Sequence, residues 1–279
     1  SRLDILSNNN QFSFYKVDLC NTSELSKIFK NNKIDFIIHL AAQAGVRYSI
    51  MKPETFFKSN LEGFFNILEL SKENKIKHLI FASTSSVYGN KKKFPLKEFM
   101  NTDKPLSFYA ATKKSNEVMA YSYSHIYNIP STALRFFTVY GPFGRPDMSL
   151  FKFAKKILKN EEVPLFNHGD HIRDFTYIDD IVEGIFLILN KPSKDKIPYN
   201  CFNIGNGIPY KLKNFLKLIE KNLEKKAKIK NLPLQLGDVR KTHSDISLFK
   251  KFSKYQPKTN IKKGIHEFIN WYKKHYKIN

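Results

Sequence analysis

Apolar stretches of two kinds alternate along the first half of the chain. Some have the continuous or alternating apolar residues of strands, and others have the spacing of amphipathic helices. We expect strands at residues 12–19, 34–42, 78–82 and 132–139, and helices at residues 22–31, 53–74 and 106–127. Asp103 and Pro105 are the expected cap and first turn of the last helix. Alternation of this kind predicts an α/β fold with a doubly wound parallel sheet that is covered on both faces.

The second half of the chain also contains expected helices and strands, but they alternate less regularly. We expect helices at residues 149–160, 180–189, 211–224 and 261–276, strands at residues 163–166, 174–178 and 202–204, and a loop around Gly237. No internal repeat or low-complexity linker separates the two halves. The pattern predicts one compact molecule with a smaller lobe that forms after about Met148.

The composition is that of a globular protein. Hydrophobic residues make up 42% of the 279 residues, enough for a sizeable core. No apolar run approaches the ~18 residues that a membrane-spanning helix needs, and no signal peptide is recognisable. The two cysteines, Cys20 and Cys201, lie far apart and form no metal or redox spacing. We therefore expect a cytoplasmic protein without a membrane partner.

A formal net charge of +22 raises the question of nucleic-acid binding. The excess comes from 41 lysines, against six arginines, and lysine runs such as 91–93 fall in expected loops without interleaved aromatics. Nucleic-acid grooves combine arginine with stacking aromatic side chains on one surface. Compositional bias is the simpler interpretation, so no nucleic-acid partner is expected. The few arginines then mark positions that need a planar, forked donor.

A tyrosine and a lysine on one helix are the first candidates for chemistry. Tyr109 and Lys113 stand four residues apart and share a helix face. The hydroxyl-bearing residues 83–86 follow the strand at 78–82, at the end of a parallel sheet where ligands bind. A tyrosine titrates near pH ~10, so it needs a nearby cation to act as a base at neutral pH. Lys113 is the expected cation, although the spacing alone is common by chance.

Three histidines are candidate metal ligands: His39, His168 and His171. His39 lies inside an apolar strand, where a hydrogen-bonded core histidine is the expected role. His168 and His171 share a loop that contains glycine, but no third ligand stands at a suitable spacing. No metal is therefore expected.

A series of motifs carries a resemblance to a known family. In order they are residues 39–47 (HLAAQAGVR), 59–63 (SNLEG), 82–89 (ASTSSVYG), 134–142 (LRFFTVYGP), 144–147 (GRPD) and 173–180 (RDFTYIDD). With the tyrosine–lysine pair they resemble the extended short-chain dehydrogenase/reductase superfamily, and most closely the UDP-glucuronate 4-epimerases. The likeness runs from near Arg2 to the carboxyl terminus. It implies a Rossmann-like sheet and an NAD-dependent isomerase.

The resemblance implies a reaction and three catalytic residues. The family inverts C4 of a UDP-sugar by transient oxidation with NAD. By family position, Tyr109 takes and returns the proton of the 4-hydroxyl, Lys113 holds the nicotinamide ribose, and Thr84 hydrogen-bonds the same sugar oxygen. The implied conversion is UDP-glucuronate to UDP-galacturonate, for polysaccharide biosynthesis. Residues 85–86 are Ser-Ser where the related dehydratases have Asp-Glu, so dehydration is disfavoured.

Family positions also imply the residues that line or support NAD. They are Asp18, Leu40, Ala41, Ala42, Gln43, Asn60, Ser83, Tyr109, Lys113 and Phe136. Asn60 is expected to brace the sheet beneath the dinucleotide and Phe136 to pack near the nicotinamide. Ordinary core packing is the alternative for both residues.

A second set of positions is implied for the UDP-sugar. Thr84, Ser85, Ser86, Thr138 and Arg145 would surround the sugar and its carboxylate, Leu165 and Phe166 would flank uracil, Arg173 would meet the diphosphate, and Asp238 would face the nucleotide. The 4-keto form of a uronic acid is a β-keto acid, which loses carbon dioxide readily. Holding the carboxylate away from the decarboxylating geometry would protect it.

The resemblance also implies a domain division and a dimer. Residues 1–147 and 173–203 would form the NAD-binding domain, and residues 148–172 and 204–279 the nucleotide-sugar lobe. A homodimer would form through the helices that contain Pro53 and Tyr109.

One departure from the family concerns the start of the chain. Family members open with a strand, a Gly-rich turn and a helix that binds the pyrophosphate. Here the first glycine is Gly45 and no Gly-x-x-Gly-x-x-Gly occurs. We therefore expect a fragment that leaves an unpaired strand edge and binds NAD poorly by itself. Two alternatives stay open: an epimerase of a neutral UDP-hexose, and an inactive remnant without NAD.

Overall fold

The computed structural model describes residues 2–278 and confirms the α/β class. Its largest sheet is parallel, with the order β1 (Phe36–His39), β2 (His78–Thr84), β3 (Ser131–Phe136) and β7 (Tyr199–Ile204). Successive side chains of a strand point to opposite faces of the sheet. Ile80 and Leu134 accordingly belong to one core cluster, and Leu79, Phe81 and Ala133 to another.

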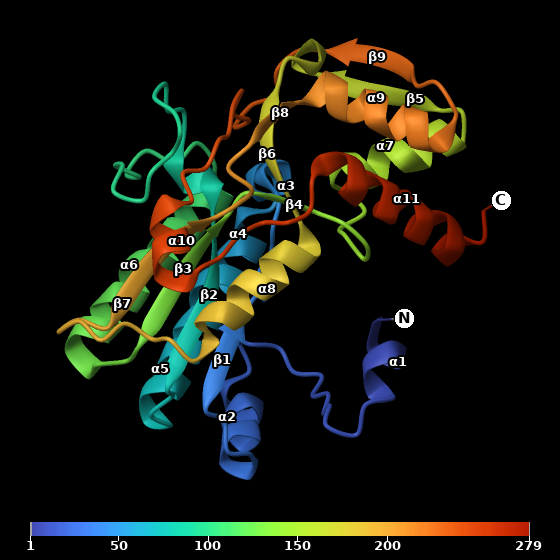
Figure 1. Ribbon diagram of the computed structural model, residues 1–279. Helices are drawn as coiled ribbons and strands as arrows, with labels where there is room; N and C mark the ends of the chain where they lie inside the picture. The colour runs from blue at the N-terminus through green and yellow to red at the C-terminus, as the bar shows by residue number, and fades with distance from the viewer. Residues whose placement is uncertain (1, 279) are drawn as a thin grey trace.

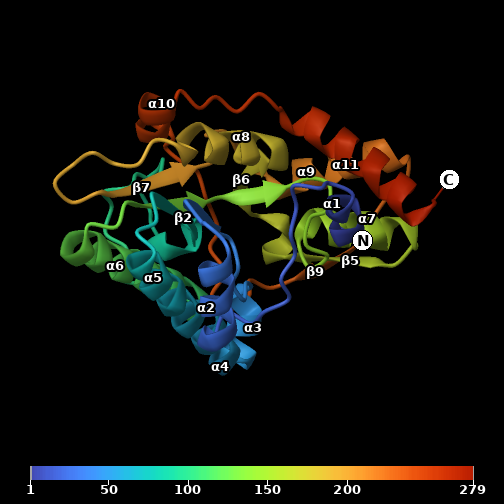
Figure 2. The same ribbon diagram turned by 90° about the horizontal axis from the view of Figure 1, so that it is seen from below.

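Helices cover both faces of this sheet (Figures 1 and 2). One face is covered by α5 (Gly63–Glu73) and α6 (Phe108–Tyr127), with α2 (Thr22–Asn31) against α5. The other face is covered by α8 (Ile178–Leu189) and α10 (Ser247–Ser253). The doubly wound arrangement predicted from the alternation of strands and helices is therefore correct.

The helix predicted at residues 53–74 is built in three parts. It starts as α4 (Pro53–Phe56), widens into the π-helical segment η1 (Phe57–Glu62), and continues as α5. The short helix α3 (Val46–Met51) precedes it. Single π-helical turns inside α-helices occur frequently at functional sites. The widened segment here contains Ser59 and Asn60, both of which hydrogen-bond the loop that follows β1.

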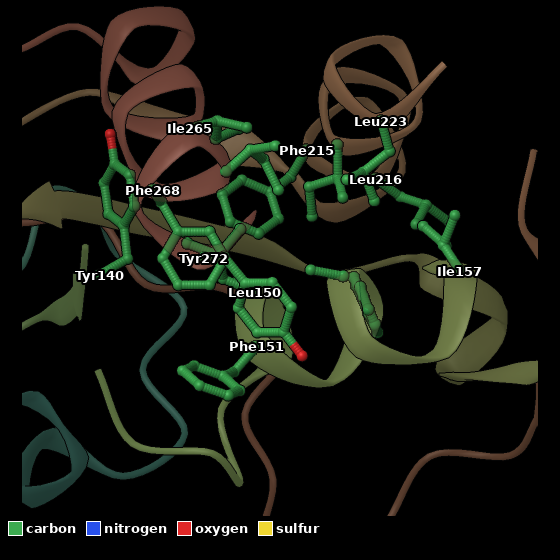
Figure 3. Close-up of a cluster of buried hydrophobic side chains, with 14 of the residues drawn as sticks. Tyr140, Leu150, Phe151, Ile157, Phe215, Leu216, Leu223, Ile265, Phe268 and Tyr272 are labelled. Carbon is green, nitrogen blue, oxygen red and sulfur yellow. The ribbon is translucent and has the colours of Figure 1, made fainter. Parts of the chain in front are cut away.

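The smaller lobe packs around its own aromatic core. Its helices are α7 (Ser149–Leu158), α9 (Leu212–Leu223) and α11 (Ile261–Tyr276), and its parallel strand pair is β5 (Glu162–Phe166) with β9 (Lys228–Leu232). Figure 3 shows Tyr140, Phe151, Phe215, Phe268 and Tyr272 converging between these helices. The rings of Phe175 and Phe215 stack in parallel with centroids 4.1 Å apart.

A third sheet joins the lobe to the larger sheet. It contains β4 (Thr138–Tyr140), β6 (Ile172–Tyr177) and β8 (Pro209–Lys211) in that order. The remaining elements are α1 (Arg2–Ser7), η2 (Ser85–Tyr88) and η3 (Asn167–Gly169). The predicted strand at 132–139 is thus divided, because the chain leaves the first sheet at Phe137 and enters the third.

Two local predictions are wrong. Residues 12–19 form no strand, since no neighbouring strand offers them a ladder, and Phe14 and Tyr15 are exposed. The cap of α6 is Ser107, whose hydroxyl accepts from the Ala110 N–H at 3.2 Å, and not Asp103. Within the described residues, β1 is an edge strand with no partner on its outer side.

The described residues contain neither a membrane-spanning helix nor a cluster of metal ligands. No helix between residues 2 and 278 is long and apolar enough to cross a bilayer. In the same part of the chain, no three His, Cys, Asp or Glu side chains are grouped so that they could hold a metal ion.

Candidate active site

The hydroxyl segment stands at the carboxyl end of β2. Thr84 is the last residue of the strand, and its side chain caps η2 by accepting from the Ser86 N–H at 3.2 Å. Its hydroxyl also donates to Ser86 Oγ at 3.3 Å. Ser85 and Ser86 are half-buried. Three hydroxyl groups are thus gathered where the central strand ends, as expected from the sequence.

Tyr109 reaches this segment from the first turns of α6. The side chain of Thr84, at the end of β2, is its neighbour. Burial raises the pKa of Tyr109, and the neighbouring Thr84 hydroxyl and the charge of Arg145 offset part of that rise. The phenol is therefore the form that predominates at neutral pH, while both neighbours favour the phenolate.

Lys113 lies one turn further along α6 and is buried. Its ammonium donates to the Ala82 carbonyl at 2.9 Å, and burial lowers its pKa to about 8. Thr84 and Arg145 lower the pKa of Tyr109 in this structure, and the expected effect of Lys113 on the phenol stays a prediction. The hydrogen bond to Ala82 directs the lysine side chain to the backbone of β2.

Asn60 fixes the loop that follows β1. Its Oδ1 accepts from the Gln43 N–H at 2.7 Å, and its Nδ2 donates to the Gln43 carbonyl at 3.0 Å and to Thr112 Oγ1 at 3.0 Å. Ser59 Oγ accepts from the same Gln43 N–H at 3.0 Å. Both backbone groups of Gln43 are thereby held from the π-helical segment. Asn60 therefore braces this loop, and its expected place beneath the dinucleotide stays a prediction.

The other residues expected to line NAD lie in different surroundings. Leu40 and Ala41 are exposed and Ala42 is half-buried, directly beyond β1. Phe136 is opposite Thr84 in the parallel register and packs on the core beneath α8. Asp18 accepts from the Cys20 N–H at 2.9 Å in an exposed turn, and this hydrogen bond lowers its pKa.

Ser83 belongs to a buried polar network beneath the site. Its hydroxyl donates to Glu117 Oε1 at 2.6 Å, and Arg135 forms a bidentate pair with the same carboxylate at 2.8 Å. Arg135 also donates to the Tyr88 hydroxyl at 3.0 Å. One guanidinium therefore anchors both ends of the segment that carries Thr84.

The acidic and basic residues on the lobe side pair with each other. Arg173 donates to Asp238 Oδ1 at 2.9 Å and to the Arg240 carbonyl at 3.1 Å. Burial lowers the pKa of Arg173. Burial opposes ionisation of Asp238, yet its neighbours His171 and Arg173 bring its pKa below the ordinary value. The structure thus brings these two expected substrate residues together.

The remaining expected substrate residues lie near the junction between the larger sheet and the smaller lobe. Arg145 forms a bidentate pair with Asp147, and Thr138 is half-buried in β4. Leu165 is buried in the lobe core, whereas the ring of Phe166 is half-buried.

Sequence reasoning missed two cations at this junction. The Arg47 guanidinium lies over the Phe166 ring, 4.5 Å from its centroid, and so joins α3 to the lobe. Burial and the charges of Arg47 and Arg145 lower the pKa of Lys152 on α7. The scarcity of arginine was a signal for Arg47. No signal in the sequence separated Lys152 from the other lysines.

The residues present fit one end of a dinucleotide. The Lys113 ammonium has three donors, one of which is used by the Ala82 carbonyl, so the others suit ribose hydroxyls. The braced loop at 40–43 offers a fixed wall beside it. A Gly-rich turn for the pyrophosphate does not occur in the sequence.

Sequence comparisons agree with this geometry. Residues 2–205 match the sequence model of the "NAD dependent epimerase/dehydratase family". Protein CapI of Staphylococcus aureus is 47% identical over 280 residues, which cover 95% of this chain and 84% of CapI. The UDP-glucuronate 4-epimerase of Thermodesulfobacterium geofontis is 41% identical, over 99% of this chain and 84% of its own length.

Solved structures show the same fold. UDP-glucuronic acid 4-epimerase from Bacillus cereus, in complex with UDP-glucuronic acid and NAD, superposes with a TM-score of 0.91 at 33% identity, covering 98% of this chain and 85% of that one. UDP-glucose 4-epimerase from Thermotoga maritima, with UDP-glucose, gives 0.90 at 29% identity, covering 97% and 88%. The fold, the arrangement of the site and the sequence match together show that this chain belongs to the NAD-dependent epimerase/dehydratase family.

Proposed function

We propose that this chain is an NAD-dependent 4-epimerase of UDP-sugars that interconverts UDP-glucuronate and UDP-galacturonate. One observation supports it most: the Tyr109 phenol lies beside Thr84, the last residue of β2, with the buried Lys113 ammonium one turn away on α6. UDP-glucuronate 4-epimerases are among the most similar relatives and solved structures.

The proposed roles follow from the protonation states. When bound, NAD supplies reversible oxidation of the sugar C4. Tyr109 accepts the proton of the 4-hydroxyl as C4 is oxidised and returns it when C4 is reduced. Thr84 hydrogen-bonds the same oxygen, and together with the charge of Arg145 it favours the phenolate that the first step needs. Lys113 holds the ribose.

Recognition of the uronic acid is assigned to the lobe junction. The Ser85, Ser86 and Thr138 hydroxyls and the Arg145 guanidinium are the donors for the sugar carboxylate. Held by such donors, the carboxylate of the 4-keto sugar would stay out of the geometry that releases carbon dioxide. Arg145→Ala is expected to weaken turnover of UDP-glucuronate.

Recognition of the nucleotide is assigned to the lobe. Some N–H donors of Arg173 are used by Asp238 and the Arg240 carbonyl. The remaining donors bind the diphosphate. Asp238 faces the nucleotide, and the backbone at Leu165 and Phe166 flanks uracil. We propose the same boundaries between the NAD-binding domain and the nucleotide-sugar lobe as the resemblance implies, at residues 147/148, 172/173 and 203/204.

We also propose the cellular setting and the assembly. The protein acts in the cytoplasm, in polysaccharide biosynthesis, and forms a homodimer through α4 to α6.

Turnover assays separate the candidate functions. The protein is incubated with UDP-glucuronate or UDP-glucose, with and without added NAD, and the products are separated by chromatography. The proposal predicts UDP-galacturonate from UDP-glucuronate, with little conversion of UDP-glucose. Preferential conversion of UDP-glucose would identify a neutral-hexose epimerase instead. Protein that binds no NAD and converts neither sugar would be the inactive remnant.

A further inference from the structure

The guanidinium of Arg145 is held along one edge by a neighbouring carboxylate. Its Nε donates to Asp147 Oδ1 at 3.0 Å and its Nη2 to Asp147 Oδ2 at 2.5 Å. The Nη2 atom also reaches the Ala44 carbonyl at 3.4 Å. A guanidinium has five N–H donors, so the two on Nη1 are left for another acceptor. The side chains are 45% and 54% exposed, so a ligand can reach them.

This pair lies beside the reacting groups. The charge of Arg145 counteracts the effect of burial on the pKa of Tyr109, so the guanidinium is close enough to act on the phenol. Its Nη2 is also 3.8 Å from the place where a Cβ on Gly45 would stand. Arg145 therefore lies against the loop that follows β1 and within electrostatic reach of Tyr109 on α6.

Arg145 is also part of a group of cations. Burial lowers the pKa of Lys152, and so do the charges of Arg47 and Arg145, whereas the charge of Asp147 raises it. Like charges so close repel each other, and a long arginine side chain relieves the repulsion by turning into water. Asp147 opposes that movement because its two oxygens hold the guanidinium at two points.

Resting on the proposed function, we propose that Asp147 is a positioning residue that fixes Arg145 by its Nε–Nη2 edge and leaves the remaining donors for the carboxylate of the uronic acid. Asp147 does not touch the reacting atoms. A neutral UDP-hexose has no carboxylate at this position, so its binding gains little from a fixed Arg145. Asp147 therefore contributes to the choice between acidic and neutral sugars.

The test measures the affinity of the full chain for UDP-glucuronate and for UDP-glucose by calorimetry. Asp147→Ala removes both acceptor oxygens, and Asp147→Asn keeps one and loses the charge. Since exposed ion pairs are worth up to ~1 kcal/mol, we expect Asp147→Ala to weaken UDP-glucuronate binding about fivefold. Asp147→Asn should lie between it and the wild type, and UDP-glucose binding should stay within about twofold. Glu162→Ala, which removes an exposed partner of Lys230, is the matched control.

The outcomes separate this inference from the proposed function. Unchanged or tighter binding of UDP-glucuronate in Asp147→Ala would overturn the inference, because Asp147 would then be idle or would compete with the substrate. An equal loss for both sugars would also overturn it, since only a general structural role predicts that. Failure of the proposed function alone would appear in the wild type, as UDP-glucuronate that binds but is not converted in the presence of NAD. A wild type that binds neither sugar would overturn both.

Discussion

At the scale of single residues, Lys113 is the clearest sign of function. A lysine that is 2% exposed costs stability, because its charged form is desolvated and the structure pairs it with a backbone carbonyl rather than a carboxylate. Burial lowers its pKa from 10.5 to about 8 as a result. Residues that reduce stability in this way are concentrated at functional sites.

Replacing this lysine by methionine should stabilise the fold and abolish activity. The pKa shift means that the buried charge destabilises the folded state by roughly 3 kcal/mol at pH 7. Losing the hydrogen bond to Ala82 destabilises the variant by about 1 kcal/mol. Lys113→Met should therefore be about 2 kcal/mol more stable than the wild type at pH 7. Between pH 8 and 10.5 the unfolded chain keeps the proton and the folded chain loses it, so wild-type stability rises with pH in this window. The variant should lack that rise.

Urea unfolding across this pH range measures both effects. Lys226→Met, at a side chain that is 90% exposed, serves as the control and should change stability by less than about 0.5 kcal/mol. A Lys113→Met protein that is less stable than the wild type at pH 7 would contradict the account.

At the scale of elements, the buried network ties α6 to the central strands. Glu117 of α6 receives two bonds from Arg135 of β3 and one from Ser83 of β2. The Tyr88 hydroxyl donates a hydrogen bond to Asn203 Oδ1 of β7 at 2.7 Å, which extends the network to a third strand. The helix that carries Tyr109 is thus fixed to the strand that carries Thr84.

Removing the charge of Glu117 should be costly. Glu117→Gln leaves the buried Arg135 guanidinium without its counter-charge, and breaking a buried pair in this way costs ~3–5 kcal/mol. Glu183→Gln is the matched control, because Glu183 pairs with Lys258 at 2.7 Å on the surface, where such pairs are worth less than about 1 kcal/mol. Equal effects of the two variants in chemical unfolding would refute the structural role given to the network.

The elements also show how far the sequence alone leads. The bounds of α2 and α11 are correct as predicted, because both have polar caps and clear apolar spacing. The strand β9 was missed, since its lysines are exposed and its partner β5 lies over 60 residues away. The π-helical segment was missed because its apolar spacing resembles that of an α-helix.

The sequence predicted which residues form the candidate site better than it predicted the contacts between them. Tyr109, Thr84 and Lys113 do gather at one end of the sheet, as the strand and helix pattern implies. The direction of the Lys113 side chain and the Arg145–Asp147 pair depend on side-chain geometry, which no spacing along the chain encodes.

At the scale of the whole molecule, one face carries an apolar surface. Exposed apolar side chains on η1, α5 and α6 include Phe57, Phe65, Val118 and Tyr121, and these elements pack against one another. Exposed apolar side chains on elements that pack together are typical of interaction sites. The proposed homodimer would cover it.

Charges placed on this surface should separate the subunits. We expect the wild type to be a dimer by size-exclusion chromatography with light scattering, and Phe65→Asp combined with Val118→Asp to be a monomer. Phe186→Asp is the control: Phe186 is 66% exposed on α8, on the opposite face of the sheet, and its variant should remain a dimer. A monomeric wild type, or a dimeric double variant, would exclude this interface.

The most direct test of the central claim is the epimerisation rate of Tyr109→Phe with UDP-glucuronate and NAD. Phenylalanine keeps the ring and its packing but removes the hydroxyl that lies beside Thr84. We predict a loss in kcat of about 10²- to 10⁴-fold, with UDP-glucuronate affinity little changed, because only the proton transfer is removed. Conversion at the wild-type rate would contradict the account.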